Sequence, residues 1–191
     1  IAGHYGRDIA ICKTKGRVET LRGKLDENKY PDVTTAIGHT RWATHGGPSD
    51  NNAHPHKTDC LALVHNGIIE NYLALKEELI AKGVEFTSDT DTEVVAHLMA
   101  DLFDGDMEST VKKVLKVIKG SYSLVFMCEA EQDKIICTKK DNPLVIGLGE
   151  GENFIASDIP AIINHTRRTF IMSDGEIATV TKDGVWVQDI N

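Results

Sequence analysis

The sequence has no long hydrophobic run and no excess of basic residues. Its longest apolar stretches, such as residues 123–128 and 144–148, are far too short to span a bilayer, and no basic-then-apolar signal opens the chain. Acidic residues outnumber basic ones by 29 to 21, and the resulting net charge of -8 opposes binding to phosphate backbones. These absences argue against a membrane protein and against nucleic acid as a partner.

Cysteine is scarce and shows no metal-binding or redox spacing. Cys12, Cys60, Cys128 and Cys137 form no Cys-x-x-Cys pair, and aliphatic residues flank each of them, as is typical of small buried side chains. We therefore expect no disulfide framework, and the pattern favours a reducing compartment, the cytoplasm. No linker, repeat or low-complexity segment divides the 191 residues, so a single domain is predicted.

Hydrophobic periodicity divides the chain into strand-like ends and a helical middle. Strands are predicted at residues 9–12, 17–22, 34–39 and 61–65. Helices are predicted at residues 71–82, 92–103 and 109–119, each followed closely by a glycine. Later strands are predicted at residues 124–128, 135–138, 144–147, 154–156, 170–172, 176–181 and 185–187, with hairpin turns at Asp174-Gly175 and Asp183-Gly184. This order favours a layered α+β domain with largely antiparallel sheets over a doubly wound fold.

The most polar feature is the loop at residues 38–46, which follows a predicted strand and is therefore held by a rigid scaffold. Arg41 is the candidate anion-binding residue, because its planar guanidinium can hold a carboxylate through two parallel hydrogen bonds. Its alternative is a surface ion pair. By burial statistics Trp42 is more often a core residue than a ligand platform. Taken alone, Thr44 and His45 are residues of an ordinary polar turn.

A second polar pair, Asn66-Gly67, follows the apolar run at residues 61–64. Asn-Gly is a frequent hairpin turn, but the residues after it lead toward a predicted helix. A strand-to-helix junction would let the Asn66 amide and the Gly67 N–H form an oxyanion hole. Asp91 and Thr92 are both suited to cap the next helix, and an acidic group that is not needed for capping can meet a ligand ammonium.

Histidines raise a rival interpretation. His39, His45, His54, His56 and His65 lie within 27 positions, and His54-Pro55-His56 has the residue types of a metal site. However, no His-Glu-x-x-His motif, cysteine pair or suitably spaced carboxylate accompanies them. We therefore expect no metal and no cofactor.

Several motifs together resemble one family. They are residues 39–46 (His-Thr-Arg-Trp-Ala-Thr-His-Gly), 52–56 (Asn-Ala-His-Pro-His), 65–71 (His-Asn-Gly-Ile-Ile-Glu-Asn), 90–98, 143–147 and 152–158. In order and combination they are similar to the glutaminase domain of glutamine:fructose-6-phosphate aminotransferases, from about residue 16 to the C-terminus. The amidotransferase of purine synthesis has similar arginine-loop and Asn-Gly motifs, but its usual pattern lacks the Trp-Ala-Thr-His and Asn-Ala-His-Pro-His segments.

The resemblance implies a fold and a substrate site. The fold is the N-terminal-nucleophile hydrolase sandwich, four αββα layers with two antiparallel sheets. Arg41 is implied to hold the α-carboxylate of L-glutamine and Asp91 its α-ammonium, with Thr44 and His45 at the same subsite. Trp42 is implied at the gate toward the acceptor.

The resemblance also implies that Asn66 and the N–H of Gly67 form the oxyanion hole, but the family's nucleophile has no counterpart here. That nucleophile is a cysteine at the start of the mature chain, whereas residue 1 is isoleucine. We expect residues 1–191 to be an N-terminally incomplete glutaminase domain. The C-terminal isomerase region, which aminates fructose 6-phosphate in the family, has no counterpart here, and the full-length protein is expected to be a homo-oligomer.

Two further interpretations stay open. In the first, the chain is a degenerate lobe that binds glutamine without hydrolysing it. In the second, it is a metal-dependent hydrolase that uses the histidines. Chelators would separate the metal-dependent enzyme from the glutaminase, and binding without turnover would identify the degenerate lobe.

Overall fold

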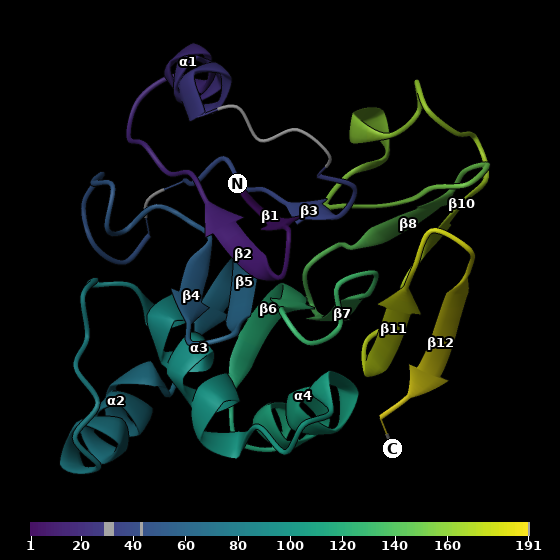
Figure 1. The fold of residues 1–191 in the computed structure, drawn as a ribbon. Helices are drawn as coiled ribbons and strands as arrows, with labels where there is room; N and C mark the ends of the chain where they lie inside the picture. The colour runs from purple at the N-terminus through teal and green to yellow at the C-terminus, as the bar shows by residue number, and fades with distance from the viewer. Residues whose placement is uncertain (29–32, 43, 191) are drawn as a thin grey trace.

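The structure, a computed structural model, describes residues 1–28, 33–42 and 44–190, which form an α+β fold (Figure 1). The helices are α1 (Val18–Asn28), α2 (Tyr72–Ala81), α3 (Asp91–Leu102) and α4 (Met107–Leu115), with a 3₁₀ helix η1 (Ile159–Ala161). The strands are β1 (Ala2–Tyr5), β2 (Asp8–Ile11), β3 (Ala36–Ile37), β4 (His56–Thr58), β5 (Leu61–Ile69), β6 (Gly120–Cys128), β7 (Ile135–Lys140), β8 (Val145–Leu148), β9 (Asn153–Ala156), β10 (Thr169–Ile171), β11 (Glu176–Val180) and β12 (Val185–Asp189). No helix in the described ranges is long and apolar enough to cross a membrane.

A six-stranded antiparallel sheet with the order β12-β11-β7-β6-β5-β4 forms the centre of the fold. Successive side chains of a strand point to opposite faces. Leu63 and Phe126 therefore lie in one hydrophobic cluster, while their neighbours Val64 and Met127 lie in a second. Since both faces are buried, these strands have continuous apolar sequences instead of alternating ones.

Helices α2, α3 and α4 contribute to the first cluster and lie together beside the central sheet (Figure 1). Leu79 of α2, Met99 of α3 and Val111 of α4 are almost completely buried there. The three helices predicted from apolar spacing are confirmed, although α4 ends at Leu115 instead of residue 119.

The second cluster joins the central sheet to two smaller antiparallel sheets, with the orders β2-β1-β3 and β10-β8-β9. Ala2 of β1, Ile37 of β3 and Ile146 of β8 are buried in it. The second layer of the expected sandwich is thus divided into two three-stranded sheets among the described residues. Helix α1 lies on the side of these smaller sheets, away from α2, α3 and α4 (Figure 1).

Two sequence predictions of local structure are wrong. A strand was predicted at residues 17–22, but residues 18–22 belong to α1, because the good helix formers in this region, such as Glu19, Leu21 and Lys24, outweigh the β-branched residues Val18 and Thr20. Asp174-Gly175 is not a hairpin, because β10 pairs with β8 and β11 with β7, so this turn connects two sheets. The turn at residues 183–184 does join paired strands, β11 and β12.

Candidate active site

Four segments that are distant in sequence meet around a cavity of about 170 Å³. Its walls are formed by His39, Thr40, Arg41, Trp42, Thr44, His54, His65, Asn66, Gly67, Thr90, Asp91 and Thr92. Six of the seven site residues predicted from the sequence are in this lining. The seventh, His45, lies beside it, with its Nδ1 3.8 Å from Oδ1 of Asp91.

The Asn66-Gly67 pair lies inside β5, which continues to Ile69. The prediction of a strand-to-helix junction at this pair is therefore wrong, as is the alternative of a hairpin turn. β5 stays paired with β6 along its whole length, with Asn66 opposite Ser123 and Gly67 opposite Tyr122. The pair is thus held by pairing with β6 instead of by a loop.

The sheet geometry directs the Gly67 N–H toward the cavity. In an antiparallel strand, alternate N–H groups point away from the paired neighbour. The N–H of His65 donates to Nδ1 of His54 at 3.3 Å, and that of Ile69 donates to Oδ2 of Asp91 at 2.8 Å. Gly67 lies between them in the same alternation, so its N–H points to the side of His54 and Asp91.

We expect Gly67→Ala to destabilise the protein by about 3 kcal/mol or more. Gly67 has a φ of 126°, and an added Cβ would lie 2.1 Å from the backbone oxygen of Ser121. Gly105→Ala is the matched control, because Gly105 has a φ of 95° and no atom within 4 Å of an added Cβ. Chemical denaturation of both variants tests this, and equal losses would contradict the steric explanation.

His39 orients the Asn66 side chain, a contact that the sequence prediction missed. Its Nε2 lies 2.7 Å from Oδ1 of Asn66. Burial lowers the pKa of His39, so at neutral pH its ring is uncharged and Nε2–H is the donor to this oxygen. The amide nitrogen of Asn66 is then the group left to donate to a ligand. Asn142 adds a second support, with its Nδ2 3.4 Å from the backbone oxygen of Asn66.

Arg41 donates to the carbonyls of its own loop. Nη2 donates to the backbone oxygens of His45 and Gly46, the latter at 2.8 Å, and Nη1 donates to that of Gly47 at 3.2 Å. Each bidentate geometry of a guanidinium uses Nη2, whose two hydrogens are both engaged here. A carboxylate that binds through two parallel hydrogen bonds must therefore displace a loop carbonyl from Nη2.

Two residues of the same loop are open to solvent. Trp42 is 89% exposed, so the expectation that it is a core residue is wrong. Thr44 is also exposed and lines the cavity. Trp42 therefore presents a large apolar surface to solvent at the edge of the cavity.

Asp91 is a buried carboxylate at the start of α3. It is 3% exposed, and Oδ2 accepts from the N–H of Ile69. The N-cap of α3 is Thr90, whose side chain accepts from the N–H of Glu93, so the prediction that Asp91 or Thr92 caps this helix is wrong. Since capping does not require Asp91, its other oxygen can meet a cation in the cavity.

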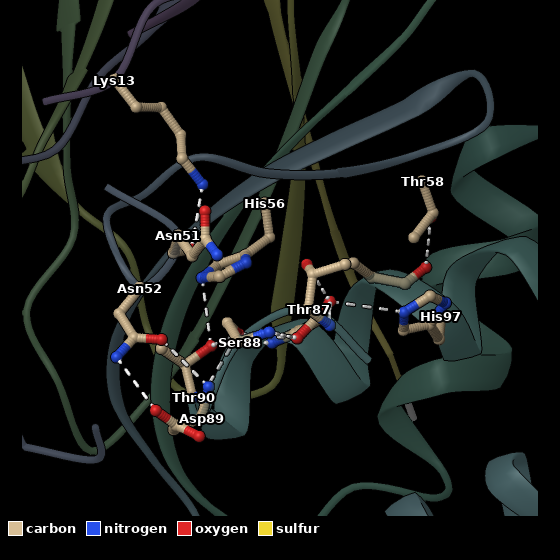
Figure 2. Close-up of polar contacts among 12 residues, drawn as sticks. Lys13, Asn51, Asn52, His56, Thr58, Thr87, Ser88, Asp89, Thr90 and His97 are labelled. Atoms are coloured by element: carbon tan, nitrogen blue, oxygen red, sulfur yellow. Dashed lines mark hydrogen bonds and ion pairs between the residues drawn. The ribbon is translucent and has the colours of Figure 1, made fainter. Parts of the chain in front are cut away.

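Glu93 holds the turn that precedes α3. Its carboxylate accepts from the backbone and side chain of Thr87 and of Ser88, at 2.6–2.8 Å. Burial alone would raise the pKa of Glu93. Hydrogen bonds from His97, Ser88 and Thr87 outweigh this effect and hold the pKa far below its usual range. Figure 2 shows the residues of this turn, Thr87 and Ser88, beside Asp89 and Thr90. The turn that positions Asp91 is therefore fixed by a buried charge.

The histidines pack against one another as neutral rings. His39 stacks on His54 with ring centroids 4.4 Å apart, and His54 meets His56 edge-on at 5.0 Å. Burial lowers the pKa of His56 to about 3 and that of His65 to about 4, and it lowers that of His54 further still. Several of their nitrogens contact protein groups, including Nδ1 of His65 at 3.0 Å from Oγ1 of Thr92. Among the described residues no His, Cys, Asp or Glu group converges in a metal-binding arrangement.

These lowered pKa values predict a loss of stability in mild acid. Between pH 6.5 and 4 the unfolded chain binds a proton at His65 that the folded chain does not, so the free energy of unfolding falls as the pH drops through this window. His65 alone accounts for a decrease of roughly 3 kcal/mol in the free energy of unfolding across this window. In the His65→Gln variant we expect the free energy of unfolding to depend less steeply on pH. The His165→Gln variant, changed at an exposed position, should keep the pH dependence of the parent protein. Denaturation curves at several pH values measure this, and identical slopes would contradict it.

Comparison with known proteins gives the family. The family model of the glutamine amidotransferase domain matches residues 39–164, which include the whole lining of the cavity. The chain belongs to the glutamine amidotransferase domain family.

Relatives of this amidotransferase domain agree with that assignment. It is 50% identical to the glutamine–fructose-6-phosphate aminotransferases (isomerizing) of Caldanaerobacter subterraneus subsp. tengcongensis and Thermus thermophilus, over 100% of this chain but only 31% and 32% of those proteins. Among solved structures, the glutamine phosphoribosylpyrophosphate amidotransferase of B. subtilis matches with a TM-score of 0.78 and 25% identity, over 100% of this chain and 42% of that one. The resemblance to the glutaminase domain of the aminotransferases and the N-terminal-nucleophile hydrolase fold are thereby confirmed, with the purine-synthesis enzyme more distant.

The cysteines of this amidotransferase domain lie outside the cavity. Cys12, Cys128 and Cys137 are buried, and Cys60 is partly buried. Burial raises the pKa of Cys128 to about 11 and raises that of Cys137 beyond this. Thiolates are the reactive form of cysteine, so these two thiols are not activated nucleophiles.

Proposed function

We propose that this domain hydrolyses L-glutamine to glutamate and ammonia, as the glutaminase part of a glutamine–fructose-6-phosphate aminotransferase. One observation carries the proposal: Asn66 and Gly67 line the same cavity as Asp91 and Arg41. A side-chain amide and a backbone N–H suit a developing oxyanion, and the two charged groups suit the two charges of an amino acid.

The substrate takes one orientation in this proposal. Its α-ammonium meets the free oxygen of Asp91, with His45 behind it, and its α-carboxylate accepts from Arg41 once a loop carbonyl is released. Thr44 adds a hydroxyl at this end of the cavity. The side-chain amide then reaches the Asn66-Gly67 donors, and the exposed Trp42 forms the gate through which ammonia leaves toward its acceptor.

The nucleophile in this proposal is a cysteine from a segment outside residues 1–191. Its α-amine takes the thiol proton, the thiolate attacks the amide carbon, and Asn66 and Gly67 stabilise the negative charge on oxygen. The C–N bond then breaks as the α-ammonium protonates the leaving nitrogen, which departs as ammonia. Water then hydrolyses the thioester to glutamate. The α-amine of a chain-terminal cysteine, with a pKa of about 7.7–8.0, suits proton transfer near neutral pH.

Two strand edges with cavities beside them support such a segment. β3 and β9 each have a strand partner on one side only among the described residues. Between them lie a cavity of about 240 Å³, lined by residues 38–40 and 155–157, and another of about 390 Å³, lined by residues 34–36 and 151–154. Unpaired strand edges accept an added strand through backbone hydrogen bonds. A strand added between β3 and β9 would join the two smaller sheets and pass His39, which lines the first of these cavities.

The remaining parts of the proposal concern the larger protein. The chain spans about 31% of the length of the relatives it matches. We assign the acceptor reaction, amination of fructose 6-phosphate, to an isomerase region outside this chain, within a homo-oligomer. The four unpaired cysteines support a reducing compartment, the cytoplasm.

Ammonia release from L-glutamine by the full-length protein, with and without a chelator, tests the proposal. We expect release at the same rate under both conditions. Release that the chelator abolishes would favour a metal-dependent hydrolase, and glutamine binding without release would favour a degenerate lobe. The control is a form of the full-length protein in which serine replaces the proposed chain-terminal cysteine nucleophile. This form should bind glutamine without releasing ammonia.

A further inference from the structure

Asn52 lies outside the active-site cavity and connects two of the segments that border it. It is 3% exposed. Its Nδ2 donates to the backbone oxygen of Gly47 at 2.9 Å, and its Oδ1 accepts from the N–H of Asp89 at 2.9 Å. Nδ2 also lies 3.4 Å from Oδ2 of Asp89. Figure 2 shows the two contacts between Asn52 and Asp89. One amide group thus holds the two segments together.

Each segment carries one of the charged residues of the site. The Gly47 oxygen that accepts from Asn52 also accepts from Nη1 of Arg41. On the other side, Asp89 lies two positions before Asp91. Asn52 therefore contacts the loop that Arg41 organises and the turn from which Asp91 projects.

The fit between the segments is close. Gly46 has a φ of 75°, and a Cβ added there would lie 2.6 Å from Nδ2 of Asn52 and 2.8 Å from Cβ of Asp89. A glycine at this position lets the loop approach the Asn52 amide. A shift of either segment would change the distance between Arg41 and Asp91.

We propose that Asn52 is a positioning residue that sets the distance between Arg41 and Asp91, and with it the preference for ligands that carry both an α-ammonium and an α-carboxylate. This inference rests on the proposed function. The two charges of an amino acid are attached to one carbon, so both contacts form together only when their partners are correctly spaced. A ligand with one of the charges has no such requirement.

The test compares Asn52→Ala with Asn51→Ala in the full-length protein, because Asn51 is the same residue type with an exposed side chain at the next position. Ammonia release gives kcat and KM for L-glutamine, and inhibition gives constants for L-glutamate and for glutarate, which lacks the ammonium. We expect Asn52→Ala to raise KM and the L-glutamate constant by about tenfold or more, with kcat and the glutarate constant changed less than about threefold. Asn51→Ala should match the parent protein.

The inference would be overturned if Asn52→Ala weakened the binding of L-glutamate and of glutarate equally. A decrease confined to kcat would also overturn it, as would kinetic constants for Asn52→Ala that match those of Asn51→Ala. If the alanine variant does not fold, Asn52→Asp keeps an acceptor for the N–H of Asp89, removes the donor to Gly47 and places a carboxylate beside that of Asp89. The same selective loss is expected. A parent protein that neither binds L-glutamate nor releases ammonia would overturn the proposed function itself. Normal parent activity with an unselective Asn52 variant would overturn only the positioning role.

Discussion

Asn66→Ala in the full-length protein should lower kcat for ammonia release by about 10²–10³, the usual effect of removing one oxyanion-hole donor. KM for L-glutamine should change little, because the amide donates mainly to an oxygen whose charge develops in the transition state. The residue is exposed in β5, and its side-chain oxygen pairs with His39, so the fold should persist. Steady-state kinetics and a thermal melt measure both effects.

Asn51→Ala is the control for this prediction, because it removes an exposed amide that does not line the cavity. It should leave kcat and KM unchanged. An Asn66→Ala variant that keeps the parent kcat, or that loses binding and turnover equally, would remove Asn66 from the oxyanion hole.

Asp91→Asn should raise KM for L-glutamine strongly, by about 10²-fold, while kcat at saturation falls much less. The substitution keeps an oxygen that can accept from the N–H of Ile69, so the local backbone contact survives. It removes the negative charge proposed to meet the ammonium, a contact that acts on ground and transition states alike. A hydrogen bond to a buried charge contributes roughly 1.5–3 kcal/mol.

Asp101→Asn is the matched control on the same helix. Asp101 forms a surface ion pair with Lys82 at 2.7 Å, and such pairs have small energies. Its replacement should leave KM unchanged. A similar KM for Asp91→Asn and Asp101→Asn would place the ammonium subsite elsewhere.

Local patterns predicted most of the elements. Helices α2, α3 and α4 follow from apolar spacing and terminal glycines, and the strands after residue 122 follow from short aliphatic runs. Strands β1 and β4 were not predicted, because they form through pairing with β2, β3 and β5, which a local pattern does not reveal. For the same reason a local pattern does not predict which sheet a strand joins. The turn at residues 174–175, predicted as a hairpin, connects β10 and β11, which belong to different sheets.

The candidate site was predicted well in residue identity and less well in geometry. The motifs implied Arg41, Asn66 and Asp91, which the fold brings to one cavity from three segments. The support given by His39 to Asn66, and by Asn52 to both loops, depends on side-chain contacts between distant segments. The Asn-Ala-His-Pro-His motif was the one sequence signal that included Asn52, and it gave no indication of its partners.

The most direct test of the central claim is to label the full-length protein with an L-glutamine analogue whose side-chain amide is replaced by an electrophilic carbon. Peptide mapping then locates the modified residue. We predict a single modified cysteine that is none of Cys12, Cys60, Cys128 and Cys137, with loss of ammonia release in parallel and protection by L-glutamate. Modification of one of these four cysteines, or full inactivation without any modified cysteine, would contradict the account.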